Sequence, residues 1–159
     1  MDKAALLKRI VEQLTSELEI YFRAARAAHA EATHEQSKAE NKYDTRGLEA
    51  SYLARGQSRQ AAELQNAISE FEKLGTRSFE GGTPIDVGAL VEVQQKSSRA
   101  LYFIGPKAGG TEVVHDGSEI LVITPQSPLG AQLQGRKQGE RLKLSLGGRT
   151  AECRIVSVS

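Results

Sequence analysis

The stretch EATHEQSKAENKYDTRGLEA, residues 31–50, decides the fold because it separates two segments with helical periodicity. Each segment places its apolar side chains along one helix face. Two such helices joined by a connector fold most simply as an antiparallel coiled-coil hairpin with residues 31–50 at its tip. The apolar positions are Leu7, Val11, Leu14, Leu18, Tyr21, Ala25 and Ala28 before the connector, and Ala61, Leu64, Ile68 and Phe71 after it.

The limits of the two helices follow from the capping and helix-breaking residues. Residues 2–34 are rich in Ala, Leu, Glu, Lys and Arg, and the first glycine is Gly47, so they are expected to form one helix. The second helix is expected to begin near Asp44 and Thr45 and to continue to Leu74, where Gly75 ends it. The Ala-rich residues 24–32 either narrow the hairpin toward its tip or simply favour helix, and the sequence leaves both readings open.

After Gly75 the sequence changes from helical spacing to the pattern of β-strands. A turn-rich linker at 80–84 precedes alternating or β-branched runs at 87–93, 99–104, 119–123, 141–146 and 149–158. Ser127 and Pro128 suit the N-cap and first position of a short helix that closes near Gly135. The sequence therefore predicts an α+β chain, with a coiled-coil hairpin over 1–76 and a small antiparallel β-sheet domain with one short helix over 77–159.

Composition and charge exclude several classes of protein. No apolar run approaches the roughly 20 residues that a membrane span requires, and Lys8, Arg9 and Glu12 interrupt any apolar segment of a signal peptide. A net charge of +1 does not indicate a strongly basic nucleic-acid binder. The single cysteine, Cys153, excludes an internal disulfide framework, fits a reducing cytoplasm, and is interpreted as a small buried residue of a strand. Because the hairpin seam is satisfied within one chain, we expect a monomer.

No motif of a self-contained enzyme appears in the sequence. The three histidines, His29, His34 and His115, lack the spacing of a metal site, and there is neither a phosphate-binding loop nor a GxSxG motif. Ser127 is better explained as a helix cap than as a nucleophile.

Two acids of the connector, Glu40 and Asp44, are candidates for a metal-binding role. At spacing i, i+4 they would share a face of a helix, and carboxylate oxygens suit Mg²⁺ when a partner supplies the remaining ligands. The alternative is a solvated helix end in which the acids pair with Lys38, Lys42 or Arg46. Charge alone favours this alternative.

The C-terminal half contains a more specific pattern. Residues 122–130 read VITPQSPLG, and Leu133, Gly135, Lys137, Gly139, the pair Gly147-Gly148 and the final run ECRIVSV at 152–158 follow in order. This order resembles the C-terminal domain of the bacterial Gre transcription elongation factors, which has an FK506-binding-protein-like (FKBP-like) fold. The hairpin, with Glu40-Asn41 and Tyr43 near its tip, is similar to the N-terminal domain of the same family.

The resemblance implies a cytoplasmic accessory factor of RNA polymerase rather than an enzyme. The sheet domain is then expected to dock at the rim of the polymerase secondary channel through Gln126, Ser127, Pro128 and Leu129. The hairpin would enter the channel, contact nascent RNA indirectly, and bring Glu40 and Asp44 to the catalytic Mg²⁺ of the polymerase, which then hydrolyses backtracked RNA. No membrane contact and no cofactor of its own are implied.

The tip departs from the family's pattern, Asp-Leu-Lys-Glu-Asn, which has two acids. Aligning its Glu-Asn on Glu40-Asn41 places Ser37 at the first acid, whereas aligning on the tyrosine places Gln36 and Ala39 at the two acids. Asp44 or Glu35 could compensate only in a tip of different shape. The alternative function is therefore a Gre-like regulator that binds the channel without stimulating cleavage. A third reading, proline isomerisation, needs an aromatic-lined pocket and is disfavoured by the scarcity of aromatic residues in this half.

Overall fold

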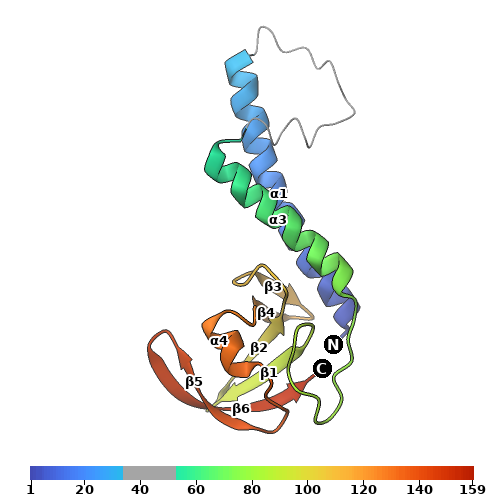
Figure 1. Ribbon diagram of the computed structural model, residues 1–159, viewed down its shortest axis with the longest axis vertical. Coiled ribbons are helices and arrows are strands. Elements are labelled where there is room, and N and C mark those ends of the chain that lie inside the picture. Colours follow the sequence, from blue (N-terminus) through green and yellow to red (C-terminus); the bar gives the residue numbers. More distant parts are fainter. Residues whose placement is uncertain (34–52) are drawn as a thin grey trace. The chain divides into compact units, whose positions relative to one another are not determined.

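The computed structural model describes residues 1–33 and 53–159 and divides the chain into two compact units (Figure 1). The first unit contains Met1–Val11 and Ser69–Ser159, and the second contains Glu12–Ile68. The start of the first helix and the end of the second thus belong to the same unit as the sheet. The domain boundary expected after residue 76 stays a prediction.

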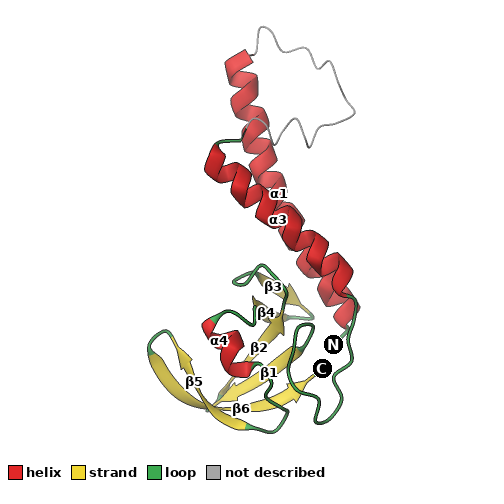
Figure 2. Cartoon of the chain, in the orientation of Figure 1, coloured by secondary structure: helices red, strands yellow, loops and turns green. Residues whose placement is uncertain are grey.

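The second unit is a helical hairpin built from α1 (Lys3–Thr33) from Glu12 onward and from α3 (Arg55–Leu74) up to Ile68. Within this unit the two helices lie side by side and run in opposite directions (Figure 2). Their shared core contains Leu18, Phe22, Ala25, Leu53 and Ala61, and the Tyr21 hydroxyl donates a hydrogen bond of 2.6 Å to Gln60 Oε1. The antiparallel hairpin expected from the sequence is confirmed.

The buried face of α1 is not the straight seam that the sequence predicts. Leu7, Leu14, Leu18 and Ala25 are buried as expected, but Ala28 is exposed. The fully buried side chains that the prediction omits are Leu6, Ile10 and Phe22, each 0% exposed. Because an α-helix has 3.6 residues per turn, side chains at positions i, i+4 and i+8 shift gradually around the helix axis. A pattern that strictly alternates spacings of four and three residues therefore misses some of the buried side chains.

Leu53 and Ala54 lie outside the second helix, which corrects the expectation that one helix runs through them to Leu74. These two residues are not helical, and α3 begins at Arg55. Ala54 acts as the N-cap: its carbonyl accepts from Ser58 N at 2.8 Å, and its N–H donates to Gln57 Oε1 at 3.3 Å. Gln57 thus supplies the return half of a capping box. The start expected at Asp44 and Thr45 lies outside the described residues.

The first unit is organised by a six-stranded sheet in the order β3-β4-β2-β1-β6-β5. The strands are β1 (Leu90–Gln95), β2 (Ser98–Ile104), β3 (Glu112–His115), β4 (Ser118–Ile123), β5 (Arg141–Leu146) and β6 (Arg149–Val158). All neighbours pair antiparallel except β2 and β4, which are parallel. The sheet is therefore mixed, and it differs from the purely antiparallel expectation in this one pair. Strand β3 was not predicted.

One face of the sheet packs on the short helix α4 (Pro128–Leu133). Val91, Ile104 and Ile155 from the strands and Leu133 from α4 are fully buried in this core. Cys153 also lies there with a free thiol, 3% exposed, which confirms its interpretation as a buried residue. Burial raises the pKa of its thiol.

Part of the opposite sheet face is covered within the same unit by the end of α3. The rings of Phe71 and Phe103 lie 6.2 Å apart between centroids, and both side chains are buried. No helix among the described residues is long and apolar enough to span a membrane.

Candidate functional site

The structure describes only one of the two groups of site residues predicted from the sequence. Glu40 and Asp44 lie outside the described residues, so their expected role at the tip stays a prediction. Elsewhere in the described part of the chain, no group of three or more His, Cys, Asp or Glu side chains could hold a metal ion. The segment Gln126–Leu129, by contrast, lies between β4 and α4 and is described in full.

Ser127 closes the turn between β4 and α4 through its side chain and its backbone. Its N–H and its hydroxyl both donate to Thr124 O, at 3.0 and 2.7 Å. Its hydroxyl oxygen accepts from Gly130 N at 3.1 Å, and its backbone is extended (φ −68°, ψ 154°). These are the properties of an N-cap, and Pro128 takes the first helical position, where no N–H is required. The cap and the short helix predicted from the sequence are confirmed.

Gly130 is required by a close backbone approach. A Cβ at this position would lie 1.8 Å from Thr124 O, a distance that no side chain can occupy. The neighbouring Leu129 points into the core that it shares with Leu133 and is 8% exposed. Of the four residues expected to contact a partner, Leu129 is therefore buried and Ser127 is half-buried, whereas Gln126 and Pro128 are exposed.

Gln132 fixes α4 to the edge strand β5. Its side-chain amide makes two hydrogen bonds with the backbone of Ser145: Oε1 accepts from the N–H at 2.9 Å, and Nε2 donates to the carbonyl at 3.3 Å. Nε2 also donates to Pro128 O at 2.9 Å. A strand edge has unpaired backbone groups, and Gln132 pairs two of them while it holds the helix that positions Gln126 and Pro128.

The other end of α4 is held by Asp86. Its carboxylate accepts hydrogen bonds from Gln134 Nε2 at 3.0 Å, Arg77 Nη1 at 2.9 Å and the N–H of Val87 at 2.8 Å. The Gln134 bond, followed by those from Arg77 and Val87, lowers the pKa of Asp86 from 3.8 to about 2. Asp86 thus connects the segment before the sheet with the end of the helix.

Sequence reasoning missed these supporting residues. Gln132 bonds a residue 13 positions away, and Gln134 bonds one 48 positions away. No local spacing marks such long-range partners. The only available signal was the presence of two glutamines in a six-residue helix and its immediate C-cap.

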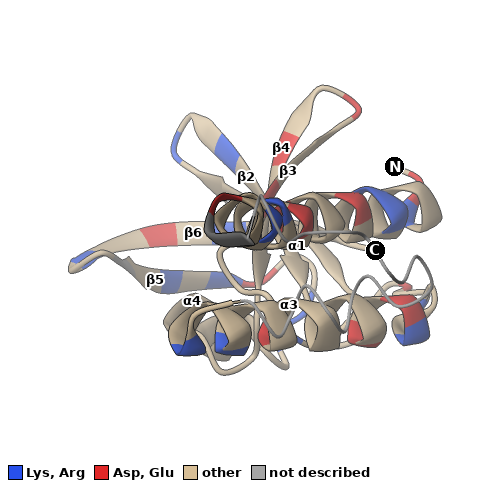
Figure 3. Ribbon diagram, turned by 90° about the horizontal axis from the view of Figure 1, so that it is seen from above, with Lys and Arg blue, Asp and Glu red and all other residues tan. Residues whose placement is uncertain are grey.

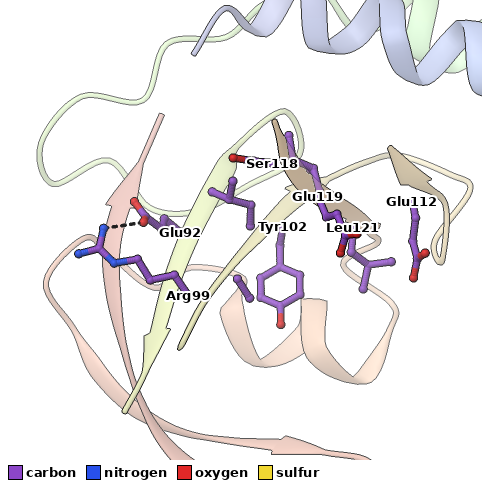
Figure 4. A pocket seen from close by; sticks show the side chains of 10 residues that line it. Glu92, Arg99, Tyr102, Glu112, Ser118, Glu119 and Leu121 are labelled. Atoms are coloured by element: carbon purple, nitrogen blue, oxygen red, sulfur yellow. Dashed lines mark hydrogen bonds and ion pairs between the residues drawn. The ribbon is translucent and has the colours of Figure 1, made fainter. Parts of the chain in front are cut away.

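A separate hollow of about 580 Å³ lies beside β2 and β4 (Figure 4). Glu92 and Arg99 form an ion pair of 2.9 Å at its border, and Tyr102 is its single aromatic lining residue. The Tyr102 ring packs in the core and is 9% exposed. This hollow therefore lacks the aromatic walls that a prolyl-isomerase site needs.

The comparisons with known proteins give matches among solved structures alone. No protein-family model matches the sequence, and no curated protein matches it either. The GreA factor homolog 1 (Gfh1) of Thermus thermophilus is 22% identical, with a TM-score of 0.39, and the match covers 94% of each chain. Gfh1 of Thermus aquaticus is 23% identical, with a TM-score of 0.40, over 95% of this chain and 94% of that chain. The elongation factor GreA/GreB of Nitrosomonas europaea is 21% identical, with a TM-score of 0.37, over 64% of this chain and 84% of that chain. These three solved structures are a GreA/GreB elongation factor and two GreA factor homologues.

Proposed function

We propose that this chain is a transcription elongation factor that binds RNA polymerase, with its hairpin in the secondary channel and its sheet unit at the channel rim. The observation that carries the proposal is the construction of the 126–130 segment. Ser127 caps α4 and Gly130 allows the close approach to Thr124, so that Gln126 and Pro128 are held at the surface. The same residues carry the resemblance to the Gre factors.

The docking surface consists, in this proposal, of Gln126 and Pro128, with Leu129 anchoring α4 from inside the core. The Gln126 side chain makes no hydrogen bond with any other described residue, so both ends of its amide are available to a partner. Pro128 offers an apolar surface that is already fixed in conformation. A polar group beside a rigid apolar one is suited to a small, specific contact.

At the hairpin tip, Glu40 and Asp44 are proposed to approach the catalytic Mg²⁺ of the polymerase. Carboxylate oxygens are ligands that Mg²⁺ prefers, and an added ligand would help to hold the ion that activates water for RNA hydrolysis. The chain would then be a cytoplasmic, monomeric accessory factor without a cofactor of its own. It would contact nascent RNA only near the polymerase active site.

A second candidate is a regulator that occupies the channel without stimulating cleavage. The observation in its favour is Ser37, which stands where the family's first tip acid is expected when Glu40-Asn41 is aligned. A serine hydroxyl is a neutral and weaker metal ligand than a carboxylate. The two candidates share the partner and differ only at the tip.

The test uses backtracked elongation complexes with labelled RNA at constant Mg²⁺. The accessory role predicts faster cleavage with the protein, loss of this effect in Glu40→Ala/Asp44→Ala, and retained polymerase binding by that variant. The matched control is Glu63→Ala/Glu72→Ala, which removes two exposed acids from α3. RNA that stays intact, together with inhibition of an authentic Gre factor, identifies the regulator. Failure to bind polymerase at all rejects both candidates.

A further inference from the structure

We propose that the exposed face of strands β2, β1, β6 and β5 binds the phosphate backbone of a nucleic-acid duplex through three aligned arginines. These residues, Arg99, Arg154 and Arg141, together with Gln94, are called the arginine row below. The inference concerns the sheet unit alone, and it does not rest on the proposed function.

The arginine row follows from the register of the sheet. Gln94 of β1 lies opposite Arg99 of β2 on one side and opposite Arg154 of β6 on the other, and Arg154 lies opposite Arg141 of β5. These four residues therefore form one line across four neighbouring strands. Figure 3 shows basic segments on the β1–β2 and β5–β6 hairpins.

Alternation along each strand places the row on the face away from α4. The neighbouring residues Val93, Cys153 and Leu142 point into the core, so Gln94, Arg154 and Arg141 point to the opposite side. All three arginines of the row are exposed, but Arg99 already forms an ion pair of 2.9 Å with Glu92 on the same face. The row thus lies on a solvent-facing surface.

The pairing of Arg141 with Arg154 leaves two like charges together. Ile155 N donates to Glu140 O at 2.9 Å, so the next pair along the ladder, Arg141 and Arg154, occupies a non-hydrogen-bonded position, where side chains approach most closely. Like charges placed directly opposite are destabilising. Neither guanidinium group forms a hydrogen bond or ion pair with another described residue. An anion between them would remove the repulsion.

The surroundings of this pair are basic and polar. An open hollow of about 780 Å³ is lined by four cations, Lys96, Arg141, Arg149 and Arg154, against one acid, Glu152, with the remaining lining supplied by Gln94, Gln95, Thr150, Ala151 and Cys153. Guanidinium groups match phosphate oxygens with two parallel hydrogen bonds. The local charge is positive although the whole chain carries only +1.

The shape of the row favours an extended ligand with repeated charges. Three strand spacings cover about 14 Å, whereas a duplex presents one negative charge per roughly 1.7 Å of its axis. No aromatic side chain lines the hollow, so a base has no ring to stack on, as it would in a single-strand site. The ligand that fits is therefore the phosphate backbone of a duplex, bound without contacts to the bases.

The test measures binding of the full chain to a labelled 20-base-pair DNA duplex, and to the same sequence as duplex RNA, from 20 to 200 mM salt by fluorescence anisotropy. Comparing the two duplexes shows whether the preferred backbone is that of DNA or that of RNA. For the preferred duplex, Arg141→Gln/Arg154→Gln is expected to weaken binding about tenfold or more. It should also lower the slope of log affinity against log salt by about 1.8, since each phosphate contact contributes about 0.9.

The matched control is Lys8→Gln/Lys107→Gln, which also removes two exposed charges but lies outside the row. Its affinity and salt slope should equal those of the wild type. A third variant, Lys143→Gln on the same face of β5, should give a smaller loss. The proposal is overturned if neither duplex binds at 20 mM salt or if the control loses as much as the double variant. It is also overturned if a poly-glutamate peptide or a single strand competes better than the duplex.

Discussion

Each residue of the Ser127-Pro128-Leu129-Gly130 segment has a separate physical role. Ser127 supplies the cap, Pro128 starts the helix without an N–H, Leu129 fills the core, and Gly130 permits the approach to Thr124. The sequence alone identified the cap and the proline, because both act within a few residues. It could not identify Leu129 as buried, since that depends on which face α4 turns to the sheet.

Gly130→Ala tests the close approach directly. The new Cβ would lie 1.8 Å from Thr124 O, so the turn must open and the Ser127 cap must be distorted. We expect a loss of about 3 kcal/mol or more in the free energy of unfolding, measured by urea denaturation. In Gly56→Ala the new Cβ meets nothing within 4 Å, and this control should be neutral or stabilising by up to about 1 kcal/mol. Equal stability of Gly130→Ala and the wild type would contradict the account.

Asp86→Asn tests the network at the other end of α4. Because the folded-state pKa of Asp86 is lowered to about 2, the carboxylate contributes stability above its unfolded-state pKa near 3.8. That contribution disappears as pH falls from about 4 to about 2. The side chain is 46% exposed, so solvent screening limits the contribution to at most about 1 kcal/mol.

Urea unfolding of the wild type and of Asp86→Asn between pH 2 and 7 measures this contribution. We expect the variant to be less stable at pH 7 and the two proteins to converge near pH 2. Glu119→Gln, which neutralises an exposed acid on β4, should follow the wild type throughout. A stability difference that persists unchanged at pH 2 would show that Asp86 acts through packing rather than charge.

At the scale of the elements, Phe22 is the largest fully buried side chain in the core of the hairpin. It is 0% exposed in the core that α1 and α3 share. Phe22→Ala should lower the free energy of unfolding of the helical unit by about 3–5 kcal/mol. The measurement is denaturant unfolding monitored by the far-ultraviolet circular dichroism of the helices. Ile20 is 64% exposed, and Ile20→Ala should change stability by less than about 0.5 kcal/mol. Similar losses in both variants would argue against the helix packing described.

The elements that the sequence predicted well are those with a strong local signal. Helix α1 begins after Asp2, whose Oδ1 accepts from the N–H groups of Ala4 and Ala5. Helix α4 begins at the Ser127 cap, and the β5–β6 hairpin turns at Gly147 and Gly148, both with positive φ. Strand β3 was missed because it has four residues and a single buried side chain, Val113. Asp116 and Gly117, both with positive φ, mark the hairpin turn that could have revealed it. The parallel pairing of β2 with β4 could not be read, since it joins strands that are not consecutive in the sequence.

At the scale of the whole molecule, the two units contribute differently to the proposed function. In the sheet unit, Gln126 and Pro128 are held in place by the packing of α4 and by hydrogen bonds at both ends of this helix. These bonds involve residues as far apart as Arg77 and Ser145. The tip residues decide between cleavage and regulation, and their role depends on the shape of a segment outside the described residues. The geometry of the described sheet unit supports the proposed docking surface, whereas the proposed chemistry at the tip rests on the sequence.

The most direct test of the account is the displacement of a fluorescent Gre factor from core RNA polymerase by this protein. We predict full displacement with one competing site. Competition should be weakened about tenfold by Gln126→Ala/Pro128→Ala, because truncating the two exposed contacts together is expected to cost about 1.4 kcal/mol. Gln138→Ala, at another exposed position after α4, should compete as well as the wild type. Absence of displacement at saturating concentrations of a folded protein would contradict the proposal that this chain occupies the polymerase channel.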